Sequence, residues 1–415
     1  MPQSSRTFST SILASTIRVV ALLLMLVGFA VTATLAQSRA YVANRFDNTV
    51  SVIDSATNTV VATVPVGTLP AVIAVTPDGA FAYVTNTSDG TVSVISSATN
   101  TVVATIPVGP VPAGIAITPD GRFAYVANAE GNDVSVIDIA SNTVIAVVPV
   151  GMSSFGVAVT PDGNFVYVAN QLSQTVSVIS TASNTVTATI PVNAVPVFIA
   201  FTPDGAFAYV TDINGGTVIV IDTATNTVAA TIPVGPSAFG LDITPDGAFV
   251  YVVTQGLNAV SVIDTTTNTV VAVVPVGSTP IDVAISPDGT LALVTNTLGN
   301  SVSVINIATN TVIATVPVGS GPFGVAFPAR GQASSIDSLI AQVEALVGEN
   351  KSRGLIEKLK QIQSKIDNGQ TAAACNQLGA FINQVNAFIK NRSLTASQGQ
   401  ALIDAANAIK ANLGC

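Results

Sequence analysis

Two aspartates in this sequence have side chains that could bind a metal ion or take part in catalysis. Asp242 lies in "AFGLDI", where the matching segments elsewhere in the chain have Ala, and Asp282 lies in "PIDVAI", where four matching segments have Gly. The two positions are two residues apart along a β-strand, so both carboxylates should point to the same face. Such a pair could hold Ca²⁺ or act as an acid and a base, or each carboxylate could be solvated or accept hydrogen bonds from backbone N–H groups.

Four phenylalanines belong to the same segments. Phe155, Phe239 and Phe323 share one position, and Phe198 is one residue further along its own segment. These rings could form an apolar collar for a ligand, or they could pack neighbouring units against each other. Together with Asp242 and Asp282 they are the candidate ligand-binding residues of the sequence.

The composition limits the chemistry. The chain has 415 residues, a net charge of −9 and no His. Without His it lacks the commonest general base and metal ligand, and it cannot form a Ser-His or Cys-His nucleophile pair. We therefore expect no catalytic residues and no cofactor, with Ca²⁺ as an unsupported possibility. The region from Gln37 to Gly331 has 17 acidic residues against 4 Arg and no Lys, which argues against a nucleic-acid partner.

A repeat of 42 residues organises most of the chain. The phrase "PDG" begins at six equally spaced positions, "YVAN" or a variant occurs seven times, and "NT" also occurs seven times. Each period contains four short runs rich in Val, Ile, Ala and Tyr, bounded by turn residues. This pattern predicts one four-stranded propeller blade per period. The "PDG" phrases start at Pro77, Pro119, Pro161, Pro203, Pro245 and Pro287.

The phase of the repeat predicts how the ring closes. The first blade begins at its second strand, "RAYVAN" from Arg39, and the chain leaves an unmatched first strand, "PFGVAF", at Pro322–Phe327. We expect the last strand to complete the first blade, which gives seven blades and removes exposed sheet edges. The fold class is thus mostly β, a seven-bladed β-propeller spanning residues 37–328.

The repeated phrases resemble a known family. "YVTN", with "TPDG" and "TNTVVATIPVG" around it, is similar to the YVTN-repeat family of seven-bladed propellers. The resemblance covers about 290 residues and implies the fold. It leaves the function open, because related propellers include surface proteins, sugar lactonases and subunits of redox enzymes.

The turns divide into two rims. The "PDG" and "NT" turns lie at one end of the blades and barely change, which indicates a scaffold. The loops at the other end, such as "RFDN", "QLSQ" and "TLGN", differ from blade to blade. We call this end the variable rim, and we expect recognition there, because binding residues are commonly on loops carried by a rigid frame.

The first 36 residues predict export. Arg6 and Arg18 precede an uncharged apolar run that ends in Thr34-Leu35-Ala36, the layout of a signal peptide with cleavage after Ala36. A membrane anchor is the alternative, because the run is just long enough to span a bilayer. The protein should then be extracellular, on the cell surface or periplasmic, and it would contact a membrane only through this segment if it is uncleaved.

The C-terminal part changes to a helical pattern. After a linker at 329–334, apolar residues recur at helical spacing through 335–415, and Thr395 with Gln398 forms a capping box. The segment resembles the FIMAH-type helical module of secreted bacterial proteins, which implies attachment or protein contact. Cys375 near the start of the third helix and Cys415 after the fourth should meet in an antiparallel pair, and an exported protein would oxidise them to a disulfide.

These observations favour a secreted or cell-surface propeller that acts as a non-catalytic binding scaffold. Its expected partners are proteins or carbohydrates of the cell envelope. The alternative is a lactonase-type hydrolase using Asp242, Asp282 and a metal. A redox partner is a third possibility, although the chain has neither a haem-attachment "CxxCH" motif nor any His.

Overall fold

The computed structural model describes two parts of the chain. The first is residues 39–328, and the second comprises 336, 339, 340, 343, 349–367, 370–391, 393–413 and 415. The predicted signal peptide at 1–36 and the linker at 329–334 lie outside the described residues. Among the helices that are described, none is long and apolar enough to cross a membrane.

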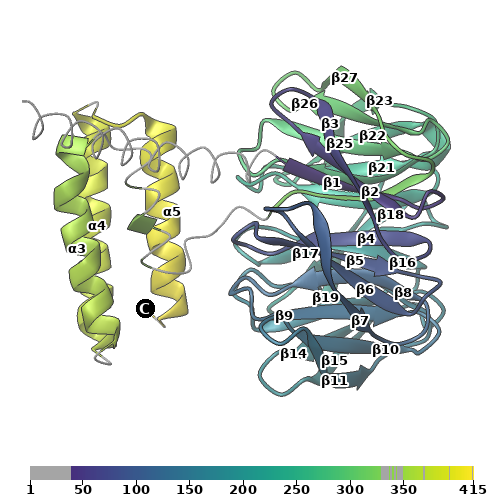
Figure 1. The fold of residues 1–415 in the computed structure, drawn as a ribbon, viewed down its shortest axis with the longest axis horizontal. Helices are drawn as coiled ribbons and strands as arrows, with labels where there is room; N and C mark the ends of the chain where they lie inside the picture. Colours follow the sequence, from purple (N-terminus) through teal and green to yellow (C-terminus); the bar gives the residue numbers. More distant parts are fainter. Residues whose placement is uncertain are drawn as a thin grey trace, which may run out of the picture.

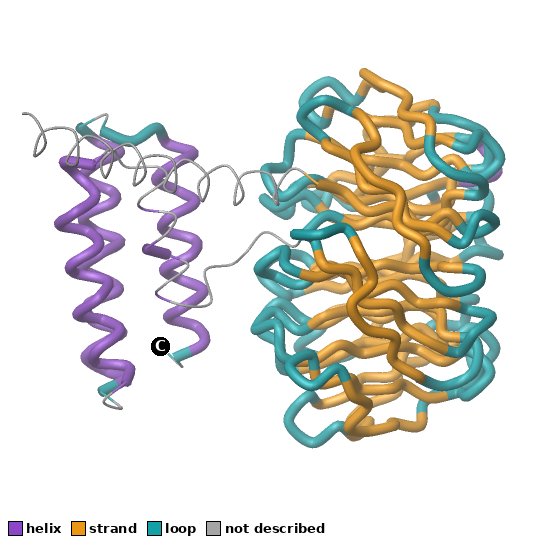
Figure 2. Tube along the Cα trace, viewed as in Figure 1, coloured by secondary structure: helices purple, strands orange, loops and turns teal. Residues whose placement is uncertain are grey.

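Residues 39–328 form a β-propeller of seven four-stranded sheets (Figures 1 and 2), as the repeat predicts. All strand pairs within the sheets are antiparallel, and consecutive strands are joined by short turns. From innermost to outermost strand, the blades are β28 (Pro322–Ala326), β1 (Arg39–Asn44), β2 (Thr49–Asp54), β3 (Thr59–Pro65); β4 (Pro70–Val75), β5 (Phe81–Asn86), β6 (Thr91–Ser96), β7 (Thr101–Pro107); β8 (Pro112–Ile117), β9 (Phe123–Asn128), β10 (Asp133–Asp138), β11 (Thr143–Pro149); β12 (Ser154–Val159), β13 (Phe165–Asn170), β14 (Thr175–Ser180), β15 (Thr185–Pro191); β16 (Pro196–Phe201), β17 (Phe207–Asp212), β18 (Thr217–Asp222), β19 (Thr227–Pro233); β20 (Ala238–Ile243), β21 (Phe249–Thr254), β22 (Ala259–Asp264), β23 (Thr269–Pro275); β24 (Pro280–Ile285), β25 (Leu291–Asn296), β26 (Ser301–Asn306), β27 (Thr311–Pro317).

The ring closes as the phase of the repeat predicts. β28 pairs with β1, which places a C-terminal strand innermost in the N-terminal blade. In Figure 1 the purple strands β1–β3 accordingly lie beside the green strands of the last blade. The loop after β1 is fastened to the chain before β28, because Arg45 N donates to Gly321 O at 3.0 Å and Ser320 N donates to Asp47 Oδ2 at 2.6 Å. Closure therefore joins residues that are more than 270 positions apart in the sequence.

The "PDG" and "NT" turns form the end of the blades opposite the variable rim, which we call the constant rim, and the "PDG" turns are built from side-chain hydrogen bonds. In the "PDG" turn of the second blade, Asp78 Oδ1 accepts from Thr76 Oγ1 at 2.6 Å and from Ala80 N at 2.9 Å, and Gly79 adopts a positive φ of 69°. The same bonds recur in the other "PDG" turns. The aspartates of this phrase are thus engaged in turn formation, as expected for Asp at this position.

In five of the seven blades a buried tyrosine is hydrogen-bonded to an asparagine of the following blade. Tyr83 OH on β5 donates to Asn142 Oδ1 at 2.7 Å, in the turn between the two outer strands of the following blade. Four further pairs repeat this bond at the same separation of 59 residues: Tyr125–Asn184, Tyr167–Asn226, Tyr209–Asn268 and Tyr251–Asn310. The asparagines also have a positive φ, which Asn tolerates better than most residues. One residue type thus serves both the turn and the contact between blades.

Close packing of the innermost strands explains their glycines. A Cβ added to Gly114 would lie 2.3 Å from Phe155 O, and one added to Gly156 would lie 2.1 Å from Val197 O. Real Cβ atoms do not approach backbone oxygens this closely, so any other residue would force the strands apart. At Gly114 and Gly156 the innermost strands therefore pass their neighbours at nearly backbone-to-backbone distance.

The C-terminal part is helical, as predicted. Its described helices are α3 (Glu349–Asp367), α4 (Thr371–Lys390) and α5 (Ala396–Asn412), which share one apolar core with Leu339 and Val343. The capping box is present, because Thr395 N donates to Gln398 Oε1 and Gln398 N donates to Thr395 Oγ1. The predicted disulfide between Cys375 and Cys415 is also present, with a Cα–Cα distance of 6.1 Å.

Candidate functional site

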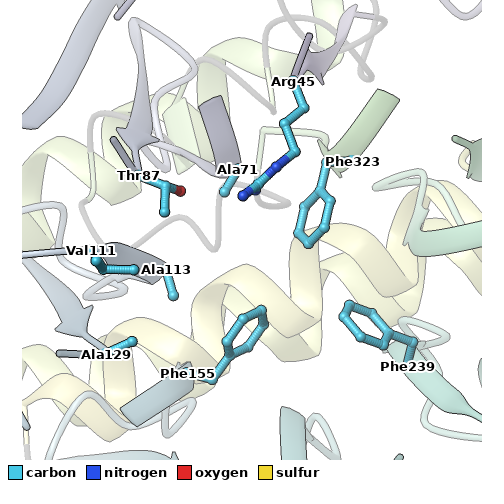
Figure 3. Close-up of a pocket in the computed structure, with 9 residues that line it drawn as sticks. All are labelled: Arg45, Ala71, Thr87, Val111, Ala113, Ala129, Phe155, Phe239 and Phe323. Carbon is cyan, nitrogen blue, oxygen red and sulfur yellow. The ribbon is translucent and has the colours of Figure 1, made fainter. Parts of the chain in front are cut away.

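The candidate site lies where the innermost strands meet the variable rim. It is a cavity of about 410 Å³, within the size range of small-molecule sites. Figure 3 shows three phenylalanine rings and the side chain of Arg45 pointing into the same space. Its lining is otherwise small or apolar: Ala71, Thr87, Val111, Ala113 and Ala129. We call this cavity the channel mouth.

The four predicted phenylalanines come together at the channel mouth. Phe155, Phe198 and Phe239 lie on three successive blades, and their ring centroids are 5.5–6.1 Å apart. Phe323 on β28 extends the cluster, 6.0 Å from Phe239 in an edge-to-face arrangement. Contact between rings that are two blades apart means that the cluster reaches across the mouth rather than merely joining adjacent blades. We call these four rings the aromatic collar.

Arg45 supplies the one positive charge that lines the cavity within the described part of the chain. Its guanidinium lies over the ring of Phe323, 5.2 Å from the centroid, in the range of a cation–π contact. The side chain is half-buried, and this burial lowers the pKa of Arg45 from its usual value. Among the described residues its guanidinium has neither an ion-pair nor a hydrogen-bond partner. A partly desolvated cation beside apolar rings is suited to binding an anion.

Sequence reasoning missed Arg45. It lies in "RFDN", one of the variable loops that were expected to carry recognition, but no motif distinguishes it there. Its position opposite Phe323 depends on ring closure, which brings the loop after β1 to the start of β28. A usable signal was present nevertheless, since the acidic repeat region contains only four Arg and no Lys. A single cation in a variable loop next to the predicted closure could therefore have been named as a candidate binding residue.

Asp242 and Asp282 lie on neighbouring innermost strands, β20 and β24, as expected. Asp242 Oδ1 accepts from Ile243 N and Oδ2 from Ile285 N, both at 2.8 Å. Asp282 Oδ1 accepts from Val283 N at 2.9 Å and Oδ2 from Val325 N at 3.1 Å. Each carboxylate oxygen is thus bonded to a backbone N–H, one in its own strand and one in the next blade.

Burial dominates the electrostatics of this pair. It raises the pKa of Asp242 to about 6 and the pKa of Asp282 to about 7, against the stabilising effect of the backbone N–H groups on the charged form. The negative charge of Asp242 raises the pKa of Asp282 further. Within the described residues, no group of three His, Cys, Asp or Glu is arranged to hold a metal ion.

The comparisons with known proteins place this chain among β-propellers. Residues 84–197 match the family model "Cytochrome D1 heme domain", and residues 230–329 match "YNCE-like beta-propeller". No curated protein sequence matches the chain. Each family match covers about a quarter of the chain, so the propeller class is supported while membership of one family is not.

Solved structures with the same fold belong to proteins whose names indicate different activities. Kuenenia stuttgartiensis hydrazine synthase is 28% identical, with a TM-score of 0.61 over 65% of this chain and 93% of that one. Dihydro-heme d1 dehydrogenase NirN in complex with DHE is 16% identical, with a TM-score of 0.57 over 71% and 76%. A putative 6-phosphogluconolactonase from Bacteroides uniformis is 19% identical, with a TM-score of 0.60 over 69% and 98%. The last two are similar in fold alone.

The expectation of no cofactor, with Ca²⁺ as the only possibility, is wrong by this comparison. The match of residues 84–197 to the model "Cytochrome D1 heme domain" points to haem d1. The sequence argument failed because it equated haem binding with His ligands and attachment motifs, whereas a tetrapyrrole also offers a flat apolar ring and carboxylates for recognition.

The described residues fit such a ring better than they fit its iron. The aromatic collar suits an apolar ring system, and Arg45 suits a carboxylate. The chain contains no His, and its two cysteines form a disulfide. Met152 on the variable rim is 55% exposed and is not part of the cavity lining. The residues that line the cavity thus include no His, Cys or Met to ligate an iron.

Proposed function

We propose that this protein is an exported, non-catalytic binding protein that captures a flat, apolar organic anion at the channel mouth. The observation that carries the proposal is the half-buried, unpaired guanidinium of Arg45 over the ring of Phe323. Partial desolvation of an unpaired charge is costly, and a ligand carboxylate would offset that cost while an apolar body covers the collar.

A tetrapyrrole acid of the haem d1 type is the ligand class that the comparisons favour. The match of residues 84–197 to a haem d1 domain supports it, as does the aromatic lining of the cavity. The ring would be held by the aromatic collar and one carboxylate by Arg45. No group at the site is assigned to covalent chemistry.

The finer assignments made from the sequence belong to the same proposal. The chain is a YVTN-type propeller at residues 37–328, and the segment at 335–415 is a FIMAH-like module for attachment or protein contact. The N-terminal 36 residues direct export. A protein or carbohydrate of the cell envelope is the expected partner of the variable rim, and the acidic, Lys-free propeller region makes nucleic acid a poor partner.

A lactonase-type hydrolase is the weaker candidate. It would use Asp242 and Asp282 with a metal, and a putative lactonase shares the fold. The four carboxylate oxygens already accept backbone hydrogen bonds, and a third candidate ligand does not accompany them among the described residues. Hydrolysis of a sugar lactone by the wild-type protein, lost in Asp282→Asn, would favour this reading over ours.

The test is an absorbance titration with metal-free protoporphyrin IX and with haemin. We expect both to bind with similar affinity, because the ring and carboxylates are recognised rather than the iron. Arg45→Gln should weaken binding by roughly tenfold or more, the effect of losing a charge-assisted hydrogen bond. Arg122→Gln is the matched control, because Arg122 lies over Phe123 next to a constant-rim turn and outside the cavity. Equal binding by the two variants, or no binding at all, would contradict the proposal.

A further inference from the structure

Asp242 and Asp282 connect three neighbouring blades through the backbone. Asp242 on β20 accepts from Ile285 N on β24, and Asp282 on β24 accepts from Val325 N on β28. Both hydrogen bonds join residues that are 43 positions apart, so the same kind of carboxylate-to-backbone bond occurs between two successive pairs of blades. At the position of Asp242 the other six innermost strands have Ala, which cannot make this bond. The sector β20–β24–β28 is therefore held differently from the rest of the ring.

The same sector carries two rings of the aromatic collar. Phe239 precedes Asp242 by three residues on β20, and Phe323 precedes Val325 by two on β28. A Cβ added to Gly240 would lie 2.4 Å from Asp282 Oδ1, so this carboxylate packs directly against the residue that follows Phe239. Asp282 thus lies against the neighbour of a lining ring, although neither carboxylate is itself among the residues that line the cavity.

Few other ionisable groups surround the pair. β20 packs against β16, β17, β21 and β24, and β24 packs against β20, β21, β25 and β28. Apart from the pair itself, these strands contribute only the following titratable side chains: Tyr209 and Asp212 on β17, and Tyr251 on β21. Both tyrosine hydroxyls donate to asparagines of other turns, and Asp212 accepts from Val195 N on the variable rim. No cation among the described residues neutralises Asp242 or Asp282.

Building on the anion site proposed above, we propose that capture of a carboxylate ligand at the channel mouth is coupled to proton uptake by Asp242 and Asp282. When the pair is ionised, the negative charges of the buried Asp282 and the partly buried Asp242 repel an anion held at the collar. When protons from the buffer neutralise the carboxylates, that repulsion disappears. By linkage, a ligand that binds the protonated form more tightly must also raise the affinity of the pair for protons.

The coupling has a measurable size. A ligand that raises the pKa of one carboxyl group by about one unit binds about tenfold more tightly below that pKa than above it. Because burial already brings the pKa of Asp282 to about 7, this change should fall between pH 8 and pH 6. Affinity for protoporphyrin IX should therefore increase on acidification, in addition to any titration of the ligand itself.

The experiment combines calorimetry with a readout that needs no ligand. Calorimetric titration of the full chain with protoporphyrin IX at pH 7, in buffers of different ionisation enthalpy, gives the number of protons taken up per ligand. We expect net uptake by the wild type, and little or none by Asp282→Asn, which still binds. Asp242→Asn is the second variant, in case the first does not fold. Asp264→Asn at the constant rim is the control and should behave as wild type.

The backbone amides of Ile285 and Val325 report the pair directly. Their ¹H chemical shifts should move as the carboxylates are protonated, whether or not a ligand is present. Binding without proton uptake, or with an affinity that the aspartate variants leave equally dependent on pH, would overturn the coupling and leave the anion site standing. If the amide shifts titrate but protoporphyrin IX does not bind at any pH, both the anion site and the coupling are wrong.

Discussion

Replacing Leu293 with Tyr should stabilise the propeller. Leu293 is the one departure from Tyr at this position in the seven repeats, and its side chain is fully buried. In five blades the Tyr hydroxyl donates to an Asn 59 residues later, in the following blade. Counted around the closed ring of seven 42-residue repeats, the partner of position 293 is Asn58. Asn58 Oδ1 is indeed buried, with no hydrogen-bond partner in the described part of the chain.

The size of the effect follows from the missing bond. A net intramolecular hydrogen bond contributes about 1 kcal/mol, and relieving an unsatisfied buried acceptor adds to this, so we expect roughly 1–2 kcal/mol. The position accommodates the ring, because the six tyrosines at equivalent positions are at most 2% exposed in the same strand. Leu293→Phe is the matched control, since it adds the ring without the hydroxyl.

The assay is equilibrium unfolding in urea, followed by the β-sheet circular dichroism signal. Leu293→Tyr should have a higher free energy of unfolding than Leu293→Phe with the same dependence on urea concentration. Asn58→Ala should remove the difference between the two, which makes the pair a double-mutant cycle. Tyr83→Phe provides the reverse case and should cost about 1 kcal/mol, because it leaves Asn142 without its donor. If Leu293→Tyr is no more stable than Leu293→Phe, the proposed bond to Asn58 does not form.

Three other predictions concern stability. Burial raises the pKa of Asp242 and Asp282 in the folded state, so their contribution to stability is fully present below the unfolded pKa of 3.8 and is lost as pH rises through the folded values of about 6 and 7. For Asp242 the full loss is about 3 kcal/mol, and Asp242→Asn should flatten the decline in unfolding free energy measured between pH 3 and pH 8. Reducing the Cys375–Cys415 disulfide, which closes 40 residues, should destabilise the helical part by about 4 kcal/mol and leave the melting of the propeller unchanged. Gly156→Ala should lower the free energy of unfolding by more than about 1 kcal/mol, because the new Cβ would force β12 away from β16. Gly354→Ala in α3, with no atom within 4 Å of the new Cβ, should raise it by up to about 1 kcal/mol, and thermal unfolding measures both effects.

The repeat made the propeller predictable to an unusual degree. Because seven near-copies follow one another without insertion, the turn residues, the strand order and the phase at each end all agree on the same ring. The innermost strand Pro322–Phe327 could be assigned to the first blade before any coordinates, since an orphan strand at one end matches a missing strand at the other. The disulfide followed from a similar argument about the ends of two antiparallel helices.

The site was only partly predictable, because it depends on distances across the ring. The shared position of Phe155, Phe239 and Phe323 indicated a collar, but nothing in the sequence showed that rings two blades apart would touch. The two aspartates were placed correctly on adjacent strands. Their hydrogen bonds to Ile285 N and Val325 N depend on how neighbouring innermost strands pack, which the sequence does not show. Periodicity predicts which face a side chain takes, and it does not predict what that face meets.

Ring closure itself builds the proposed site. Arg45 and Phe323 are separated by almost the whole propeller sequence, and they meet only because β28 pairs with β1. The backbone bond from Arg45 N to Gly321 O fixes the loop that carries the guanidinium to the segment that precedes Phe323. Asp282 in turn holds Val325, two residues beyond Phe323 on the same strand. The strand that completes the fold therefore also positions the ring, the cation and the amide bonded to the buried carboxylate, so any change that loosens closure should impair anion capture before it unfolds the other six blades.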